Sequence, residues 1–472
     1  MKLFRQSLAI SSILSLLLFT VAAAQEGGID HSLLKEFEKA FESNGDQKSI
    51  INAVTGNDIK QLSLNREVLV KHNKLVNHKL DGTGVIDQQG SGRCWIFAGV
   101  RVLAPKVKSK LDLSDFEISE PYLTFYDKLE KANFFLERII ELRDKPLDDR
   151  SLQLDIEYFF GDGGWWHYFT DLIHKYGLVP ISAMPETKQS IKTGTFNKLA
   201  KTMLRGHASQ LRQMHQSGKK LGELRGAKEK MLEDIYRLLI YTYGVPPKQF
   251  SFRYEEEQDS TEQIVEKDFT PRSFFEEFFG EELPDYVTIV NNPAKDFDKP
   301  YLLEASRNIW ENPDFLVLNL EIEKLKEYTL KSLLDSQAVW FSCDVGKQNL
   351  KDSGIFAADM YEFDALLNMD FSLTKAERIQ YKDTSPNHAM TIVGVDTAAT
   401  GEPVKWLVQN SWGTKPGDGG YWYMYDNWFD EYVLAVVVQE DMLSEEDERK
   451  LDQIPVKISD WEPFFLALRN LP

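Results

Sequence analysis

The chain has 472 residues, of which 42% are hydrophobic and 27% charged, a globular composition that excludes long disordered, collagen-like or coiled-coil chains. Its formal charge of −19 at pH 7 disfavours a whole-molecule affinity for nucleic acid or for an anionic membrane. Its two cysteines are too few for a disulfide scaffold or a thiolate metal cluster.

The N-terminus has the pattern of a secretory signal. Lys2 and Arg5 precede an uncharged apolar run, residues 8–24, that ends in three alanines, the small-residue pattern that signal peptidase reads. The run is short for a membrane span of ~20 residues, which favours cleavage over a membrane anchor. We therefore expect residues 1–24 to be removed and the mature protein to be exported, to a periplasm or to the medium.

Helical patterns dominate the first half of the chain. Cys94 follows a glycine-rich loop and opens an apolar run that ends before Pro105, which predicts a turn leading into a buried helix. A second glycine loop, residues 161–164, precedes another helical segment. The spacing of apolar residues further predicts helices over residues 30–45, 119–142 and 190–245.

From about residue 286 the pattern changes to short β-type runs. The expected strands lie within residues 286–290, 315–322, 338–345, 389–396, 404–412, 420–426 and 432–438. The sequence therefore predicts a helical first half and a β-rich second half.

Cys94 is the candidate nucleophile. A free cysteine is usually a small buried hydrophobe, but the N–H groups at a helix start lower a thiol pKa. The glycines before Cys94 allow the backbone to approach a substrate closely. Cys343 lies in mid-strand among apolar residues, and we expect it to be structural.

A nucleophilic thiol needs a base and a group that orients the base. His388 begins a predicted strand, and Asn410 ends a later one, with Trp412 close behind. A lone histidine is more often a structural group. If the two strands are neighbours, however, Asn410 can accept from one imidazole nitrogen and leave the other facing Cys94, while Trp412 shields that bond from water.

The order Gln-x5-Cys-Trp, His-Ala and Asn-Ser-Trp-Gly resembles the papain-like cysteine proteases. From about residue 60 to the C-terminus, the chain resembles most closely the branch of bleomycin hydrolase and aminopeptidase C. The motifs that carry this resemblance are SGRCWIFAG (91–99), YDKLEKANFF (126–135), DGGWW (162–166), KYGLVP (175–180), WFSCDVGK (340–347) and NHAMTIVGV (387–395).

The resemblance implies an α+β, papain-like two-lobed fold, with a helical lobe, a β-barrel-like lobe and a helical insertion. Its expected parts are a signal peptide (1–24), an N-terminal segment with the helical catalytic lobe (25–189), a helical insertion for oligomerisation (190–285), a β-rich catalytic lobe (286–448) and a C-terminal arm reaching the cleft (449–472).

The same resemblance implies the catalytic roles. Cys94 is the expected nucleophile, His388 the general base and then acid, and Asn410 the group that orients His388. The side-chain amide of Gln88 and the backbone N–H of Cys94 are the expected oxyanion donors, and such donors contribute a few kcal/mol each. No metal and no organic cofactor is expected.

On the substrate side, the resemblance implies that the backbone of Gly163 and Gly164 pairs with an extended peptide, with Trp412 nearby. Asp162 stands where papain relatives often have asparagine. The terminal carboxylate of Pro472 is expected to meet the α-ammonium of the substrate, which would make the enzyme an aminopeptidase acting on peptides. The arm is a few residues longer than is typical for this branch, and endopeptidase action is the alternative.

A homohexamer with its active sites facing an inner channel is also implied by resemblance. A hypothesis of a different class rests on residues 198–230, which hold nine Lys or Arg against two Glu and could bind a polyanion or nucleic acid. A solvated helical face, or one that opposes acidic neighbours across an oligomer interface, is the favoured interpretation. His207 and His215 share a helical region without the further ligands of a metal site.

Overall fold

The computed structural model describes residues 27–43, 47–81, 84–111, 116–258 and 261–464. The expected signal segment and Pro472 lie outside these residues. The chain divides into two compact units, one of residues 1–64 with 362–370 and one of residues 65–361 with 371–472. In the described ranges, none of the helices combines the length and apolar character needed to cross a bilayer.

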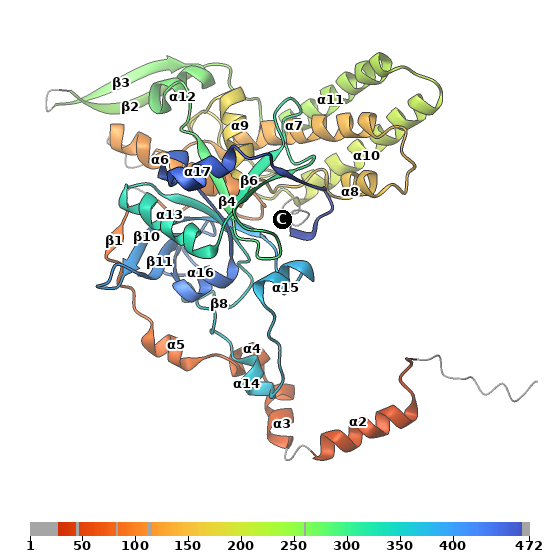
Figure 1. The fold of residues 1–472 in the computed structure, drawn as a ribbon. Coiled ribbons are helices and arrows are strands. Elements are labelled where there is room, and N and C mark those ends of the chain that lie inside the picture. Colours follow the sequence, from red (N-terminus) through yellow and green to blue (C-terminus); the bar gives the residue numbers. More distant parts are fainter. Residues whose placement is uncertain (1–26, 44–46, 82–83, 112–115, 259–260, 465–472) are drawn as a thin grey trace, which may run out of the picture. The chain divides into compact units, whose positions relative to one another are not determined.

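The smaller unit is helical (Figure 1). Its chain segments are joined where the N–H of Glu362 donates to the carbonyl of Ser63 at 2.7 Å. The sequence grouped residues 25–64 with the helical catalytic lobe, whereas the structure groups residues 27–64 with a segment some three hundred residues later. The helices of this unit are α2 (His31–Ser43), α3 (Lys48–Gly56), α4 (Ile59–Leu62) and α14 (Phe363–Leu367).

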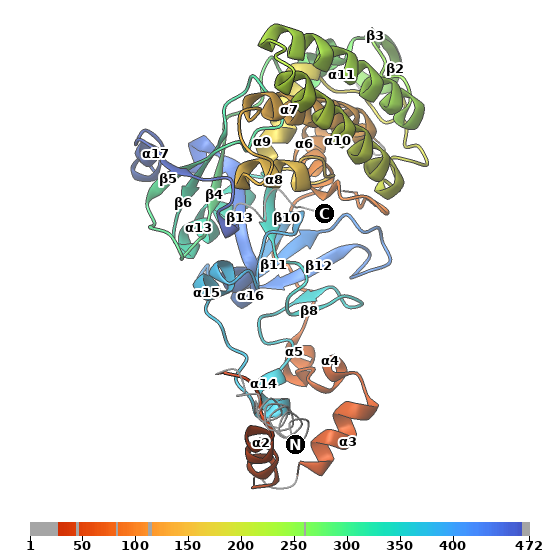
Figure 2. The same cartoon turned by 90° about the vertical axis from the view of Figure 1, so that its right-hand side faces the viewer.

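In the larger unit, the helical lobe is centred on α7, which packs against α6, α9, α10 and α11 (Figure 2). Ser119 caps α7 by accepting from the N–H of Tyr122 at 3.2 Å, as helix starts favour. The helices before the sheet are α5 (Arg66–Lys71), α6 (Cys94–Leu111), α7 (Glu120–Glu141), α8 (Arg150–Tyr158), α9 (Trp166–Tyr176), α10 (Gly194–Gln216), α11 (Leu221–Tyr243) and α12 (Pro271–Phe279).

The insertion over residues 190–285 is only partly helical, and this corrects the expectation. After α10 and α11 it contains an antiparallel hairpin of β2 (Phe250–Gln258) and β3 (Thr261–Phe269) (Figure 1). Aromatic side chains on one face of the hairpin pack on α12, with the rings of Phe252 and Phe274 5.5 Å apart. An alternating strand with one buried face accounts for this local structure.

The β-rich lobe is built on a sheet of order β14-β5-β6-β4-β13-β7-β10-β11-β12-β9-β8, with β1 beside β10. This is an open strand order and not the barrel-like closure that the sequence suggested. The strands are β1 (His78–Lys79), β4 (Tyr286–Val290), β5 (Lys299–Leu303), β6 (Phe315–Asn319), β7 (Val339–Cys343), β8 (Asn349–Leu350), β9 (Ile355–Phe356), β10 (His388–Thr397), β11 (Pro403–Gln409), β12 (Tyr421–Tyr425), β13 (Val433–Gln439) and β14 (Val456–Ile458).

The two faces of the sheet are buried in different cores. Trp340 and Ala389 belong to the core shared with the helical lobe, whereas Phe341 and Met390, their neighbours in sequence, belong to the core on the other face. This is the alternation expected of a strand buried on both sides. The helices on and after the sheet are α13 (Ile322–Leu334), α15 (Lys375–Gln380), α16 (Asp426–Tyr432), the short 3₁₀ helix η1 (Glu440–Met442) and α17 (Glu445–Leu451).

Candidate active site

Cys94 is the first residue of α6, as the glycine-rich loop before it predicts. Its side chain is buried, with 1% of its surface exposed. Burial raises the pKa of the Cys94 thiol to about 11, against the effect of the backbone N–H groups of Ala389, Trp95 and Cys94 itself, which lower it. The helix start therefore supplies the donors that a thiolate needs, inside a poorly solvated site.

His388 and Asn410 lie at the ends of neighbouring antiparallel strands, β10 and β11. The imidazole Nε2 lies 2.9 Å from the Asn410 Oδ1. Because an amide oxygen only accepts, Nε2 carries the proton in this pair and Nδ1 is left as the basic nitrogen. Burial lowers the pKa of His388 to about 4, against the Asn410 hydrogen bond, which raises it.

Trp412 covers the His388 side of this pair. Its ring stacks on the imidazole with centroids 4.8 Å apart and planes inclined by 28°. The structure thus brings Trp412 against His388, in the shielding position that the sequence analysis gave it.

Contacts from two neighbouring strands, the one that begins with His388 and β7, join the sheet to the helix that begins with Cys94. The N–H of Ala389, the residue after His388, lies close enough to the Cys94 sulfur to lower the pKa of its thiol. One turn further into α6, the Thr391 hydroxyl donates to the carbonyl of Ala98 at 3.1 Å. From β7, the indole N–H of Trp340 donates to the carbonyl of Trp95 at 3.2 Å. The thiol and the imidazole are therefore carried by elements in direct contact.

Gln88 lies in the glycine-rich loop before Cys94, and both polar atoms of its side-chain amide are hydrogen-bonded. The amide Nε2 donates to the carbonyl of Ser91 at 2.6 Å, and Oε1 accepts from the hydroxyl of Ser411 at 2.6 Å. One of the two Nε2 hydrogens is thereby used, and the other is free to act as a donor in the site. Ser411 adjoins Asn410, a link that the sequence analysis did not anticipate.

The glycine pair lies beside the helix of the nucleophile. A Cβ on Gly164 would come within 2.6 Å of the Trp95 ring, so only glycine lets this segment pass so close to α6. The Trp95 indole N–H donates to the carbonyl of Asp162 at 2.7 Å. The carbonyl of Gly163 already accepts from the Lys131 ammonium, a partner that the sequence analysis missed.

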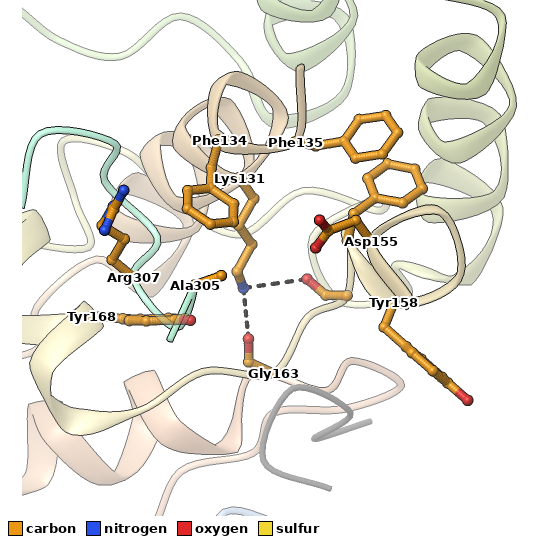
Figure 3. A pocket seen from close by; sticks show the side chains of 11 residues that line it. Lys131, Phe134, Phe135, Asp155, Tyr158, Gly163, Tyr168, Ala305 and Arg307 are labelled. Carbon is orange, nitrogen blue, oxygen red and sulfur yellow. Dashed lines mark hydrogen bonds between the residues drawn. The ribbon is translucent and has the colours of Figure 1, made fainter. Parts of the chain in front are cut away.

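Lys131 and Gly163 line a pocket between the helical lobe and the loop after β5 (Figure 3). Phe134 and Tyr168 give it aromatic walls, and Arg307 closes one side. The motif YDKLEKANFF contains three of the residues that line the pocket, Lys131, Phe134 and Phe135, but its helical pattern did not indicate that Lys131 turns inward.

The C-terminal arm runs past this pocket up to the last described residue, Phe464. Strand β14 pairs with β5, and Asp460 lies 3.7 Å from Arg138. Arg138 also binds Asp155 at 2.9 Å, and Asp155 lines the pocket. The position of Pro472 falls outside the described residues, but the arm before it is anchored next to the Gly163 segment.

Cys343 is opposite His388 in the register of β7 and β10. Its thiol lies 3.8 Å from the carbonyl of His388, and burial raises its pKa well above the ordinary value. Such a thiol stays protonated and packs as an apolar group.

The basic segment 198–230 is largely engaged within the lobe. Arg225 and Lys228 both bind Glu137, at 3.2 and 2.6 Å, and Lys219 binds Glu223 at 2.7 Å. These acidic partners belong to the same chain, so a contact with acidic neighbours across an oligomer interface stays a prediction. Within the described residues, no group of three His, Cys, Asp or Glu side chains is arranged to hold a metal ion.

Comparisons with known proteins agree with this geometry. The model of the Peptidase C1-like family matches residues 28–465. Aminopeptidase C of Listeria monocytogenes is 37% identical over 432 residues, with 91% of this chain and 97% of that protein covered. Aminopeptidase C of Lactobacillus helveticus is 33% identical over 440 residues, with 92% and 97% covered.

Among solved structures, PepW from Lactobacillus rhamnosis matches with a TM-score of 0.88 and 35% identity, covering 93% of this chain and 98% of that one. The family model and these relatives span nearly the whole chain, including the loop of Cys94 and the strands of His388 and Asn410. The chain therefore belongs to the Peptidase C1-like family of papain-like fold.

Proposed function

We propose that this protein is a cysteine aminopeptidase that hydrolyses the N-terminal amide bond of peptides. One observation carries the chemistry: Asn410 holds His388 at the ends of adjacent strands, and the strand that His388 begins packs on the helix that Cys94 begins, where the Ala389 N–H lowers the thiol pKa. This is the arrangement of nucleophile, base and orienting group that acyl transfer requires. The relatives named aminopeptidase C support the exopeptidase assignment.

In the first step the Cys94 thiol passes its proton to Nδ1 of His388, and the sulfur attacks the scissile carbonyl carbon. The Cys94 N–H and the remaining Nε2 hydrogen of Gln88 donate to the oxyanion, each contributing a few kcal/mol. The His388 imidazolium then protonates the departing amine, which leaves a thioester on Cys94. Water attacks this thioester while His388 takes its proton; the C–S bond then breaks, the carboxylic acid product is released, and the His388 imidazolium returns the proton to the Cys94 sulfur.

The burial of Cys94 and His388 supports this order of reaction steps. Burial disfavours an isolated thiolate and an isolated imidazolium alike, so the two charges form together, as a pair, when the proton moves. The stack of Trp412 on His388 keeps water from the Asn410 bond. The base therefore stays neutral and correctly oriented until it takes the proton.

The path of the arm supports action at the N-terminus of the substrate. The arm is bound beside the Gly163 pocket through Asp460 and Arg138, and eight residues follow Phe464. In our proposal the carboxylate of Pro472 binds the substrate α-ammonium. An ion pair of this kind selects a free amine and blocks longer chains from the same half of the cleft.

The test is mass spectrometry of products from one peptide in free and N-acetylated form. We expect single residues to be released from the free peptide and the acetylated peptide to stay intact. Cleavage of both at equal rates would replace the aminopeptidase assignment with endopeptidase action. A variant that ends at Phe464 sharpens the result, because loss of the arm should convert the enzyme towards cleavage of the acetylated peptide.

Export and assembly belong to the same proposal. Residues 1–24 support export, and the N-terminal sequence of the protein recovered from its producing cell should then begin at Gln25.

The exposed apolar side chains of α2, with Phe37 and Phe41 each 53% exposed, support association of copies, by resemblance into a hexamer. Light scattering of the purified protein should give six chain masses, and a monomer would contradict this part.

A further inference from the structure

Asp162 is a buried carboxylate, 6% exposed, on which four hydrogen-bond donors converge. The N–H of Gly92 donates to Oδ2 at 3.0 Å, and the Thr193 hydroxyl donates to the same oxygen. The Lys128 ammonium and the Asn197 side-chain amide each donate to Oδ1 at 2.7 Å. Buried charges persist when they are paired and fully hydrogen-bonded in this way.

These donors come from separate parts of the fold. Gly92 belongs to the loop of Gln88 and Cys94, Lys128 to the middle of α7, and Thr193 and Asn197 to the start of α10. The backbone carbonyl of Asp162 adds a fifth contact, to the Trp95 indole. One residue therefore connects the catalytic loop, the nucleophile helix, α7 and the insertion.

Only a carboxylate satisfies all four donors. An asparagine at position 162 has one oxygen and one NH₂ group. If its oxygen accepted from Gly92, its NH₂ would face the Lys128 ammonium; if the amide were flipped, its NH₂ would face the Gly92 N–H. Either orientation opposes a donor to a donor, so the neutral isostere must release either the loop or the lysine.

Lys128 and a second lysine of α7, Lys131, also hold the glycine segment that is proposed to bind the peptide. Lys128 donates to the carbonyl of Gly161 at 2.6 Å. Lys131 donates to the carbonyl of Gly163 (Figure 3), and it is paired with the Asp127 carboxylate at 2.7 Å. The two lysines thus hold the backbone of segment 161–163, while the Asp162 side chain holds the loop that contains Gly92.

We propose that Asp162 is a positioning residue of the active site: its carboxylate fixes the Gly92 amide and so sets the approach of the Gln88 and Cys94 donors to the substrate carbonyl. This inference rests on the proposed function, because it concerns the acyl-transfer site. It also makes the start of α10 part of the catalytic support, through Thr193 and Asn197.

The charge of Asp162 has a separate effect on the thiol. Although burial acts to raise it, the Lys128 ammonium and the converging donors hold the pKa of Asp162 well below its usual range. Its anion acts to raise the pKa of Cys94. The other charged or titratable groups that face the Asp162 carboxylate are Lys131, Lys201 and Tyr243, and the two lysines partly offset its charge.

The experiment compares Asp162→Asn with Asp447→Asn. Asp447 is also a buried carboxylate, in the other lobe, bound by Tyr328, Ser444 and Lys450, and it controls for the general cost of removing such a charge. Two quantities are measured: kcat/KM per thiol titrated with iodoacetamide, and the pH dependence of the rate at which iodoacetamide alkylates Cys94, followed by mass spectrometry.

We expect Asp162→Asn to lower kcat/KM per titrated site roughly 10- to 100-fold, the range expected for displaced catalytic groups, mostly in kcat. The alkylation profile should move to lower pH, because an anion is removed and Lys128 loses its counter-charge. Asp447→Asn should change neither quantity per titrated site. Thr193→Val, which removes one donor and no charge, should give a smaller loss in kcat and an unmoved profile.

Two results would overturn the inference: full kcat/KM per titrated site in Asp162→Asn, or an alkylation profile that stays in place or rises. The alkylation measurement needs no peptide substrate. It therefore tests Asp162 even if the wild-type chain proves inactive on free peptides, an outcome that would overturn the proposed function alone.

Discussion

The helical side of the site is held by buried charges, whereas the β side is held by strand register and aromatic packing. Around Cys94, the loop and the 161–163 segment depend on Asp162, Lys128 and Lys131, each with specific partners. Around His388, position follows from the pairing of β10 with β7 and β11 and from the stacked Trp412. Directional bonds between few groups can fail singly, while a sheet spreads its support over many residues.

The comparison is meaningful only if both sides of the site take part in one reaction. Cys94→Ala should abolish hydrolysis of aminoacyl amides, with a loss of roughly 10⁶-fold in kcat, as for the nucleophile of a serine protease. Cys343→Ala, which removes the only other thiol, should retain activity. Substantial turnover by the Cys94 variant would place the chemistry elsewhere.

The next largest effect is expected on the helical side. Lys131→Met leaves the Asp127 carboxylate buried without its cation, which costs about 3–5 kcal/mol of unfolding free energy when a buried pair loses one partner. Denaturant unfolding measures this loss. The double variant Asp127→Leu/Lys131→Met should recover most of it, since no isolated charge remains; a double variant no more stable than the single one would contradict the role assigned to the charges.

On the β side, Asn410→Ala should lower kcat roughly 100-fold with little change in unfolding free energy, because it releases the orientation of His388. Asn349→Ala, in the edge strand β8 of the same sheet, serves as the control and should keep full kcat. An equal loss in both variants would mean that the sheet, and not the imidazole, was disturbed.

Val436→Ala probes the sheet itself. Val436 is fully buried on β13, and the loss of two methyl groups should cost about 2 kcal/mol. Because the register has many other contacts, kcat per folded molecule should be unchanged. A drop in kcat per titrated thiol would show that the β side, like the helical side, depends on individual side chains.

The smallest effect is a response to pH. His388 must be neutral to accept the thiol proton, and its pKa is lowered to about 4. As pH falls through about 4 the imidazole is protonated, so kcat/KM should decline about tenfold per pH unit below that point. A midpoint near 6.5, the ordinary value for histidine, would mean that burial does not control this group.

The sequence predicted the β side well. The runs at 286–290, 338–345 and 389–396 became β4, β7 and β10, because β-branched and aromatic runs leave little choice of structure. The hairpin at 250–269 was wrongly included in a helical segment, although Phe250, Phe252 and Tyr254 alternate with polar residues. The acidic residues that follow masked that period of two.

The charged support of the helical side could not be predicted in the same way. Lys128 and Lys131 in a helical pattern look like a solvated face, yet both are buried in the structure. Their partners, Asp162 and the carbonyls of 161 and 163, lie some thirty residues later, and only the packing of α7 among four helices brings them together. The sequence motifs identified the candidates Cys94, His388, Asn410 and Gln88, but not what holds them.

The adjacent residues Asn410 and Ser411 serve both halves of the chemistry, since one orients the imidazole and the other fixes the Gln88 amide. In the proposed mechanism, the insertion or deletion of one residue at this strand end would disturb both proton transfer and oxyanion binding. This dipeptide should therefore tolerate no change in length.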